Sequence, residues 1–494
     1  MANDWSTFGS DLHLELRGPR LRAGLMDALR EAVRSGRLAA GTRLPSSRSL
    51  AADLGMARNT VADAYAELVA EGWLTARQGS GTRVAPRASP RTPAPAAPVS
   101  PPAGTGRDRS AAPAHSLKSG SPDLASFPRA EWLKAYRRAL TNAPNEAFGY
   151  GDPRGRIELR LALCEYLARA RGVHARPERV VICAGFVHGL ELMGRVLRAR
   201  GVRNVAVESY GLALHDGLLR RAGLRTPVLG FDERGTRTQE LPELGDCGAV
   251  LMTAAHQYPL GGALPPERRA AVVDWARTSG GLVLEDDYDG EFRYDRQPVD
   301  PTPWQHDENP SSRHRLPVGA LQALDPGHVV YMGTASKSLA PGVRLGWMVL
   351  PAPLVGDVAA LMAGTGGACN VLDQLALAEF IQSGAYDRHL RRMRLRYRRR
   401  RNELISRLAT DAPHLRVFGV AAGLHVGLEL PPGTEQPTIR AAVRAGLVLQ
   451  GLSPFRRPDT VGPPRDGLVI GYGTPSDSQW PGALNALVLA LPEP

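Results

Sequence analysis

Residues 333–346 read GTASKSLAPGVRLG and follow directly on the apolar run Val329 to Met332. Such a run predicts a buried strand, so Lys337 lies just past a strand end, among small hydroxyl side chains. A lysine placed in this way can form a Schiff base with an aldehyde. Three polar residues around it can together bind a phosphate: Thr334, Ser336 and Arg344. Lys337 is also one of only three lysines among the chain's 61 lysines and arginines.

Similar apolar runs recur on both sides of this stretch and alternate with segments of helical character. They are Val180 to Ile182, Val205 to Val207, Ala249 to Met252, Leu282 to Leu284 and Leu345 to Leu350. This alternation predicts an α/β domain with a largely parallel sheet and crossover helices. Ligands of such sheets bind at the carboxyl ends of the strands, so the residues that follow each run are candidate site residues.

Two of the runs are followed by residues whose side chains or backbone groups can bind a ligand or take part in catalysis. Glu285 to Asp289 (EDDYD) offers a carboxylate that can pair with a protonated pyridine nitrogen, and a tyrosine that can bond a phenolic oxygen. A calcium-like acidic loop or a solvated turn is the alternative. Cys183 to Gly189 (CAGFVHG) reads as a strand–turn–helix whose first free N–H groups suit a phosphate. The chain has no GxGxxG or Walker pattern, so nucleotide binding has little support.

The N-terminal region predicts a winged helix-turn-helix. Residues 44–74 read LPSSRSLAADLGMARNTVADAYAELVAEGWL. We expect an amphipathic helix over Leu21 to Leu38, with Leu21, Leu25, Leu29 and Val33 on its apolar face. We further expect a short helix capped by Ser46 or Ser47, a helix from about Ala57 to Glu71, and a hairpin with Gly79 at its tip.

Charge and residue types in this module suit DNA. The predicted second helix of the motif opens with Arg58-Asn59-Thr60, which can enter a major groove, and Arg48 lies on the helix before it. The whole chain carries a net charge of +12, with a pI of about 9.9. A solvated three-helix module that mediates protein contacts is the alternative.

Composition divides the chain into three parts: residues 1–85, a Pro/Ala-rich linker over 86–115, and a large domain over 116–494. A polar insertion, Val299 to Gly319, holds His306, Asp307, Glu308 and His314, but these lack a fixed ligand spacing and we expect no metal site. The chain has no apolar run long enough for a bilayer, no secretory signal at its start, and four widely spaced cysteines. We expect a cytoplasmic protein, associated with the nucleoid when bound to DNA.

Several motifs resemble known families. Residues 44–74 closely resemble the DNA-binding domain of the GntR family. The region from Ser116 to Leu491 resembles a fold-type I aminotransferase, a fold that binds pyridoxal 5′-phosphate (PLP). The whole chain is therefore similar to the MocR subfamily of transcriptional regulators. The motifs behind the second resemblance are Tyr150 to Gly155 (YGDPRG), His256 to Pro259 (HQYP), Glu285 to Tyr294 (EDDYDGEFRY) and residues 333–346.

The resemblance implies residue roles and a head-to-tail homodimer. Lys337 would carry PLP as a Schiff base, Asp286 would pair with the pyridine nitrogen, and Tyr288 with the phenolic oxygen. The remaining cofactor contacts would be Gly185, Phe186, Thr334 and Arg344 at the phosphate, Tyr150 at the phosphate of the neighbouring subunit, and Tyr210 stacked on the ring. The residues implied to face operator DNA are Arg48, Arg58, Asn59, Thr60 and Gly79.

The sequence departs from the aminotransferase pattern. Tyr258-Pro259 lacks the asparagine that touches the cofactor, and Leu468 stands where we expect the arginine that grips a substrate carboxylate. Arg456 or Arg465 could substitute. The loop Glu208 to Gly211 is about two residues shorter than in relatives, which bears on Tyr210.

We interpret the chain as a DNA-binding regulator that senses PLP, an amino acid or an amine through PLP. The alternatives are a working aminotransferase with a DNA-binding module, and a regulator whose large domain only dimerises. Nine arginines between Arg388 and Arg401 are either a second DNA surface or a solvated helix face, and we favour the latter.

Overall fold

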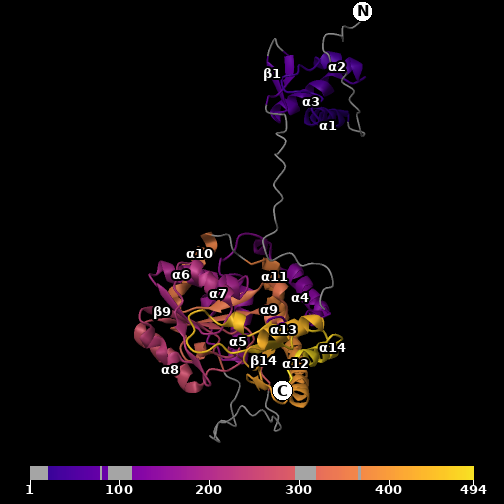
Figure 1. Ribbon diagram of the computed structural model, residues 1–494. Helices are drawn as coiled ribbons and strands as arrows, with labels where there is room; N and C mark the ends of the chain where they lie inside the picture. Colours follow the sequence, from indigo (N-terminus) through magenta and orange to yellow (C-terminus); the bar gives the residue numbers. More distant parts are fainter. Residues whose placement is uncertain (1–20, 78–80, 87–113, 295–318, 365–368, 494) are drawn as a thin grey trace, which may run out of the picture. The chain divides into compact units, whose positions relative to one another are not determined.

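The computed structural model describes residues 21–77, 81–86, 114–294, 319–364 and 369–493, which form two compact units (Figure 1). The units are Met1–Asp108 and Arg109–Pro494, and each is described by itself. Most of the predicted linker, nearly all of the polar insertion, and the predicted hairpin tip with Gly79 lie outside the described residues.

The N-terminal unit is a three-helix module with a hairpin. Its elements are α1 (Leu21–Arg34), α2 (Ser47–Asp53), α3 (Arg58–Ala70), β1 (Leu74–Arg77) and β2 (Gly81–Val84), the two strands being antiparallel. Ser46 caps α2 by accepting a hydrogen bond from the Ser49 amide at 3.1 Å. This is the layout that the sequence predicts.

The core of this unit corrects one predicted position. Leu25, Leu29 and Val33 are buried, but Leu21 is 53% exposed. Leu21 is the first residue of α1 and precedes the packed turns of the helix. Met26, which is buried, joins the core instead.

A seven-stranded sheet forms the centre of the C-terminal unit, in the order β4-β12-β11-β10-β9-β5-β6. Its strands are β4 (Val180–Cys183), β5 (Asn204–Glu208), β6 (Val228–Leu229), β9 (Cys247–Met252), β10 (Leu282–Asp286), β11 (Val329–Thr334) and β12 (Gly346–Val349). β12 runs antiparallel to both its neighbours, and the other pairings are parallel. The predicted α/β class is confirmed, and the six apolar runs predicted as strands of the large domain all lie in this sheet.

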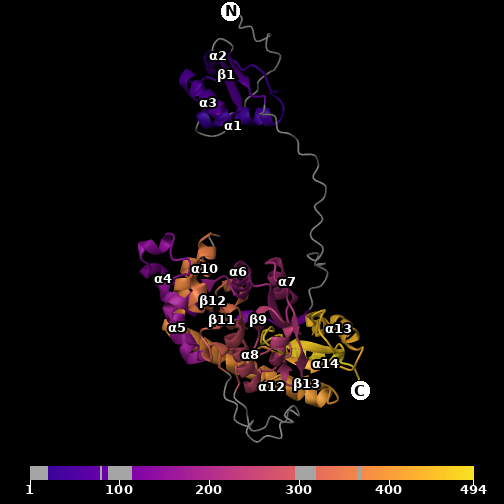
Figure 2. The same cartoon turned by 90° about the vertical axis from the view of Figure 1, so that its left-hand side faces the viewer.

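Helices cover both faces of the sheet (Figures 1 and 2). One face packs on α6 (Phe186–Ala199), α7 (Ala213–Arg221) and α10 (Ala352–Gly364). The other packs on α5 (Ile157–Arg171), α8 (Pro266–Ser279), α11 (Val371–Gln382) and α12 (Ala385–Asp411). The alternation of side chains along β11 explains this, because Val330 and Met332 enter the first core whereas Tyr331 enters the second.

A smaller antiparallel sheet follows α12. It contains β13 (Arg416–Phe418), β14 (His425–Glu429), β17 (Gly467–Gly471) and β16 (Gln450–Gly451), and lies with α13 (Glu435–Arg444) and α14 (Trp480–Ala490). Short elements ahead of the large sheet are β3 (His115–Ser116), η2 (Leu124–Ser126), α4 (Arg129–Asn142) and η3 (Asn145–Phe148). β3 pairs with β15 (Leu447–Val448), which ties the start of the described C-terminal unit to its last third.

The arginine-rich segment of α12 is only partly the solvated face that we favoured. Arg400 is fully buried, and its Nη2 donates to Asp123 at 3.1 Å and to Asp477 at 2.8 Å. Arg401 is also buried, whereas Arg391, Arg392 and Arg399 are exposed. Part of this charge therefore fixes α12 to neighbouring segments.

Candidate cofactor site and nucleic-acid interface

Lys337 lies on α9 (Ala335–Ser338), directly after β11. Its Nζ donates a hydrogen bond to the carbonyl oxygen of Gly120. Burial lowers the pKa of Lys337, and the nearby carboxylates of Asp286 and Asp289 oppose that shift. A partly desolvated amine next to carboxylates is suited to attack a carbonyl.

Asp286 ends β10, the strand next to β11, and is 6% exposed. Burial raises the pKa of Asp286 well above its usual range, and the Lys337 charge opposes the rise. Its Oδ1 has no hydrogen-bond partner among the described residues. An unpaired buried carboxylate oxygen is costly, and a protonated ring nitrogen is the donor that would satisfy it. The residues present therefore fit PLP.

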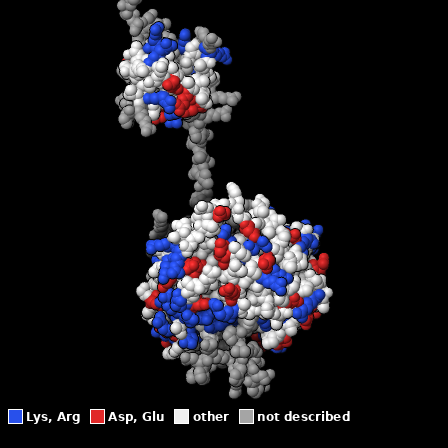
Figure 3. Space-filling view, turned by 180° about the vertical axis from the view of Figure 1, so that it is seen from behind, with Lys and Arg blue, Asp and Glu red and all other residues white. Residues whose placement is uncertain are grey.

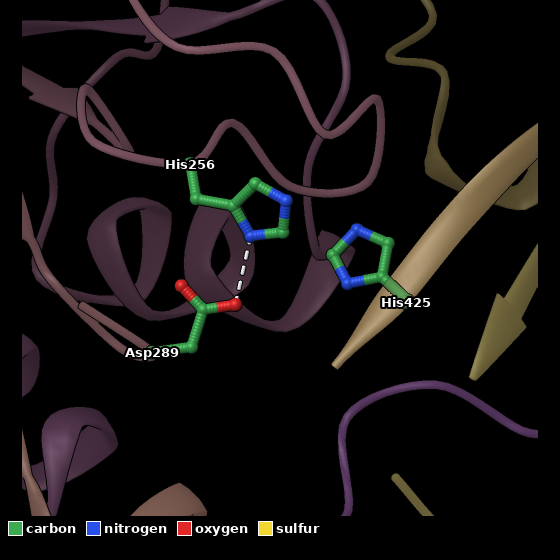
Figure 4. A group of neighbouring side chains, drawn as sticks. All are labelled: His256, Asp289 and His425. Atoms are coloured by element: carbon green, nitrogen blue, oxygen red, sulfur yellow. Dashed lines mark hydrogen bonds and ion pairs between the residues drawn. The ribbon is translucent and has the colours of Figure 1, made fainter. Parts of the chain in front are cut away.

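Tyr288 joins a buried hydrogen-bonded group of side chains that follow β10 and β9. His256 Nδ1 lies 2.7 Å from Asp289 Oδ2 (Figure 4) and 3.0 Å from the Tyr288 hydroxyl. Burial alone would raise the pKa of Asp289, but His256 and His425 hold it below its usual value. The sequence argument quoted His256 only as part of a motif and gave it no role.

His425 completes this group, and its Nε2 lies 3.1 Å from the Pro259 carbonyl. Burial lowers the pKa of His425 to about 3, so its ring is neutral at physiological pH. One ligand atom from each of His256, Asp289 and His425 lies within 4.8 Å of the others. Because His256 and Asp289 already bond each other, we interpret the three as a relay that orients Tyr288.

The predicted phosphate-binding residues are brought together where β4 and β11 end. Gly185 precedes α6 as its N-cap with a φ of 87°, and a Cβ placed on it would lie 3.5 Å from Nη1 of Arg344. Thr334 Oγ1 accepts from the Ser336 amide at 3.1 Å and caps α9. The start of α6 and the nearby guanidinium are groups that can bind a phosphate, and we call this place the phosphate cradle. Phe186 is the first residue of α6.

His215, on α7, is a site residue that the sequence argument missed. Its ring packs on Phe186 with a centroid distance of 4.7 Å. Burial lowers the pKa of His215 to about 4, with contributions from the charges of Arg457 and Lys337. The only sequence signal was its position shortly after a strand.

Tyr210 is not placed beside Lys337 by any contact in the described residues. It is 4% exposed and packs in a cluster with Leu260, Phe455 and Val469, and its ring lies 6.2 Å from Phe231. The Tyr210 side chain therefore packs toward the smaller sheet, through Val469 of β17.

An apolar residue, Leu468, occupies the position where we expected an arginine that binds a substrate carboxylate. Leu468 packs into the main core, and its neighbour Val469 points to the opposite face of β17, toward Tyr210 and Phe455. Arg465 Nη2 lies 3.3 Å from Glu429, and Arg456 Nη2 donates to the Thr460 and Gly462 carbonyls. Both candidate arginines thus already have partners.

Two further positions bear on the site. Tyr258 occupies the place of the expected asparagine, and its hydroxyl lies 2.7 Å from Ser119 Oγ, one residue before Gly120. Tyr150 is fully exposed within its own chain.

Four of the predicted DNA-facing residues lie in the described part of the N-terminal unit. Arg48, Arg58 and Asn59 are exposed and Thr60 is half-buried, at the starts of α2 and α3, whereas Gly79 lies outside the described residues. Arg43 is also exposed, with its side chain close to Gly81 of the hairpin and its backbone bridging Arg83. No helix among the described residues is long and apolar enough to span a membrane.

Comparison with known families agrees with this architecture. Residues 21–84 match the family described as bacterial regulatory proteins, gntR family, and residues 115–459 match aminotransferase class I and II. The fold and site thus define a helix-turn-helix module joined to an aminotransferase-type domain.

Curated relatives share this combination over nearly their whole length. The chain is 31% identical to the pyridoxine biosynthesis transcriptional regulator PdxR of Corynebacterium glutamicum, covering 91% of each chain. It is 31% identical to the probable rhizopine catabolism regulatory protein MocR of Rhizobium meliloti, covering 91% of this chain and 89% of that one. It is 32% identical to the regulator TauR of Rhodobacter capsulatus, over 87% and 88%. The chain belongs to the MocR-type GntR transcriptional regulators, and it is a DNA-binding regulator.

Solved structures agree with the fold of the C-terminal unit. An archaeal alanine:glyoxylate aminotransferase matches with a TM-score of 0.65 and 23% identity, covering 76% of this chain and 89% of that chain. The α-aminoadipate aminotransferase LysN of Thermus thermophilus matches with a TM-score of 0.64 and 24% identity, over 76% and 91%. This likeness establishes a fold-type I aminotransferase architecture.

Proposed function

We propose that the C-terminal unit holds PLP on Lys337 and that ligand binding at this site controls the binding of operator DNA. The observation that carries the proposal is the unpartnered Oδ1 of Asp286, buried beside an amine that follows the adjacent strand. When bound, PLP supplies an aldehyde that condenses with amines and a ring nitrogen that accepts a proton.

Each residue then has a task that its surroundings support. Lys337 provides the amine, and Gly120 holds that amine in place until it reacts. Asp286 bonds the ring nitrogen, and Tyr288, oriented by His256, donates to the phenolic oxygen. The residues proposed to hold the phosphate are Gly185, Phe186, Thr334 and Arg344. For the position stacked on the ring we propose His215 in place of the expected Tyr210, because His215 packs on Phe186 and interacts with the Lys337 charge, whereas Tyr210 packs in a cluster with Phe455 and Val469.

The effector we favour is PLP itself or an amine without a carboxylate. Leu468, where a carboxylate-binding arginine was expected, packs into the main core, and both Arg456 and Arg465 are bonded to neighbours. The name of the PdxR relative, a regulator of pyridoxine biosynthesis, adds support for a vitamin B6 ligand. An amino acid effector would have to displace one of these arginines from its partners.

We also propose a head-to-tail homodimer that works in the cytoplasm, on the nucleoid when bound to DNA. Large apolar side chains are exposed together on α4, η3 and α5, which is unusual unless a partner covers them. They are Leu133, Leu140, Phe148, Ile157 and Leu161. In such a dimer Tyr150 would reach the partner's phosphate. On the DNA, we propose contacts from Arg48, Arg58, Asn59, Thr60 and Gly79.

Absorption spectroscopy of the full chain tests the proposal. We expect a visible band after incubation with PLP that is missing in Lys337→Ala, and a shift of that band with one member of a panel of amines and amino acids. A shift without keto-acid release supports a sensor. Steady keto-acid release would instead indicate a working aminotransferase. The absence of any band would reject the cofactor and leave a domain that only dimerises.

A further inference from the structure

A separate hollow opens on the C-terminal unit between the start of α4 and the first half of α12. Its volume is about 420 Å³, within the range of small-ligand sites. The residues of its lining that matter here are Phe127, Arg129, Glu131, His389, Arg392 and Arg396. Lys337, Asp286 and the phosphate cradle do not line it.

The lining is positively charged. It holds three arginines and one glutamate, and the Arg392–Glu131 pair is 3.7 Å apart with both side chains largely exposed, so it is weak. The first turn of α4 also lines the hollow, and its N-cap Pro128 makes no side-chain hydrogen bond to it. A helix start attracts anions. Figure 3, a view from behind, shows basic side chains gathered at the lower left of the C-terminal unit.

His389 supplies a second and more specific feature. It is 2% exposed, its Nε2 lies 2.9 Å from the Ser338 carbonyl, and its Nδ1 has no partner among the described residues. Since a carbonyl accepts only, Nε2 carries the hydrogen and Nδ1 presents a lone pair. Burial lowers the pKa of His389, which keeps the ring neutral. A ligand that satisfies this lining must combine negative oxygens for the arginines with one O–H for His389.

We propose that this hollow is a binding site for a small phosphate-type oxyanion, such as inorganic phosphate or a phosphate monoester. In its monoanionic form such a group carries both negative oxygens and an O–H. Arg129 and Arg392 would bind the oxygens, and His389 Nδ1 would accept from the hydroxyl. Arg396 contributes less, because it already pairs with Asp123 and Asp477.

The site is connected to Lys337 by a short path. His389 bonds the carbonyl of Ser338, the residue after Lys337, and Tyr386 of the same helix donates to the Ser338 hydroxyl at 2.8 Å. Oxyanion binding would therefore change the affinity of the Lys337 site for PLP. This second part rests on the proposed function, whereas the binding site itself does not.

Calorimetry of the full chain with inorganic phosphate, at constant ionic strength in chloride, tests the site. Three variants with the same charge change separate the possibilities: Arg392→Gln in the hollow, Arg391→Gln beside it on the same helix, and Arg344→Gln in the cofactor cradle. We expect at least a tenfold loss of affinity in Arg392→Gln, less than a twofold change in Arg391→Gln, and a binding event that survives in Arg344→Gln. His389→Gln, whose amide can still donate to Ser338, should lose affinity while keeping its thermal midpoint.

Other outcomes overturn the assignment. If phosphate binding disappears in Arg344→Gln but survives in Arg392→Gln, the ion occupies the cofactor cradle only. If unrelated duplex DNA, and not phosphate, loses affinity in Arg392→Gln relative to Arg391→Gln, the hollow is part of a DNA surface. For the connection, saturating phosphate should change the PLP affinity of wild type at least threefold more than that of Arg392→Gln. Equal changes would reject the connection and leave the calorimetric result standing.

Discussion

The Asp286 carboxyl and the Lys337 amine follow adjacent parallel strands, and each opposes the loss of charge that burial imposes on the other. Neither is satisfied by this alone, because Asp286 Oδ1 lacks a donor among the described residues and Lys337 turns to a backbone carbonyl. A hydrogen-bond donor bound beside Asp286 Oδ1 would satisfy that oxygen.

Asp286→Asn should change stability and cofactor affinity in opposite directions. Folding raises the pKa of Asp286 above its unfolded value of about 3.9, so without PLP the stability falls as the pH rises from about 4 through the raised pKa. The asparagine amide does not ionise, so the variant does not lose stability in this way. At pH 8 we expect its free energy of unfolding, measured in urea, to exceed that of the wild type by about 1 kcal/mol. PLP affinity should fall at least about tenfold, because a charge-assisted hydrogen bond is lost.

The matched control is Asp274→Asn on α8, whose side chain is largely exposed. It should change neither quantity. Lower stability of Asp286→Asn at pH 8, or unchanged PLP affinity, would contradict the role given to this carboxyl.

Gly185→Ala tests the phosphate cradle. A side chain at a φ of 87° is strained, and we expect a loss of about 1–3 kcal/mol in the free energy of unfolding. Gly201→Ala is the control, because its φ is 91° and a Cβ there meets nothing within 4 Å. Both variants should lose stability in urea, but only Gly185→Ala should also bind PLP more weakly in an absorption titration. Equal PLP affinity in the two variants would place the phosphate elsewhere.

Tyr150→Ala tests whether the site is shared between subunits. Tyr150 is fully exposed within its own chain, so its replacement should change the free energy of unfolding of the isolated subunit by about 0.5 kcal/mol or less. PLP affinity should nevertheless fall about tenfold if the residue reaches a partner's phosphate. Fluorescence titration with PLP measures this. An unchanged affinity would remove Tyr150 from the site.

Arg58→Ala should weaken binding to operator DNA by about 1–3 kcal/mol, which is roughly tenfold or more. The side chain is exposed at the start of α3, where a recognition helix contacts bases. Fluorescence anisotropy with DNA from upstream of the gene measures the effect. Arg22→Ala, which removes an equally exposed charge from α1, is the control and should keep most of the affinity. Equal losses in both variants would indicate charge attraction alone.

The sequence predicted the fold well because its signals were local. The apolar runs that precede Lys337, Asp286 and Gly185 predicted the strands and the edge of the sheet where these residues lie. The two-residue strand β6 was missed, since so short a run has no readable periodicity. Arg400 was misjudged because burial between Asp123 and Asp477 depends on segments far away in the chain.

The site was predicted less completely for the same reason. His256 and His425 meet Asp289 only after three separate segments have folded together, and neither residue has a local signature. His215 and Val469 are further examples, because their roles follow from which face of an element meets the site. Residue type after a strand indicates candidates, whereas side-chain direction has to come from the structure.

The hydrogen bond from Lys337 to Gly120 links the proposed cofactor site to the first described segment of the C-terminal unit. Gly120 lies six residues after Ala114, where the described C-terminal unit begins, a contour length of about 20 Å at most. That short segment is held by Val448 and Gly471 of the smaller sheet. In the proposed sensor, reaction of the Lys337 amine would take the hydrogen-bond donor away from Gly120, in the segment that leads to the DNA-binding unit. Chemistry on α9 would then change how the first described residues of the C-terminal unit are held.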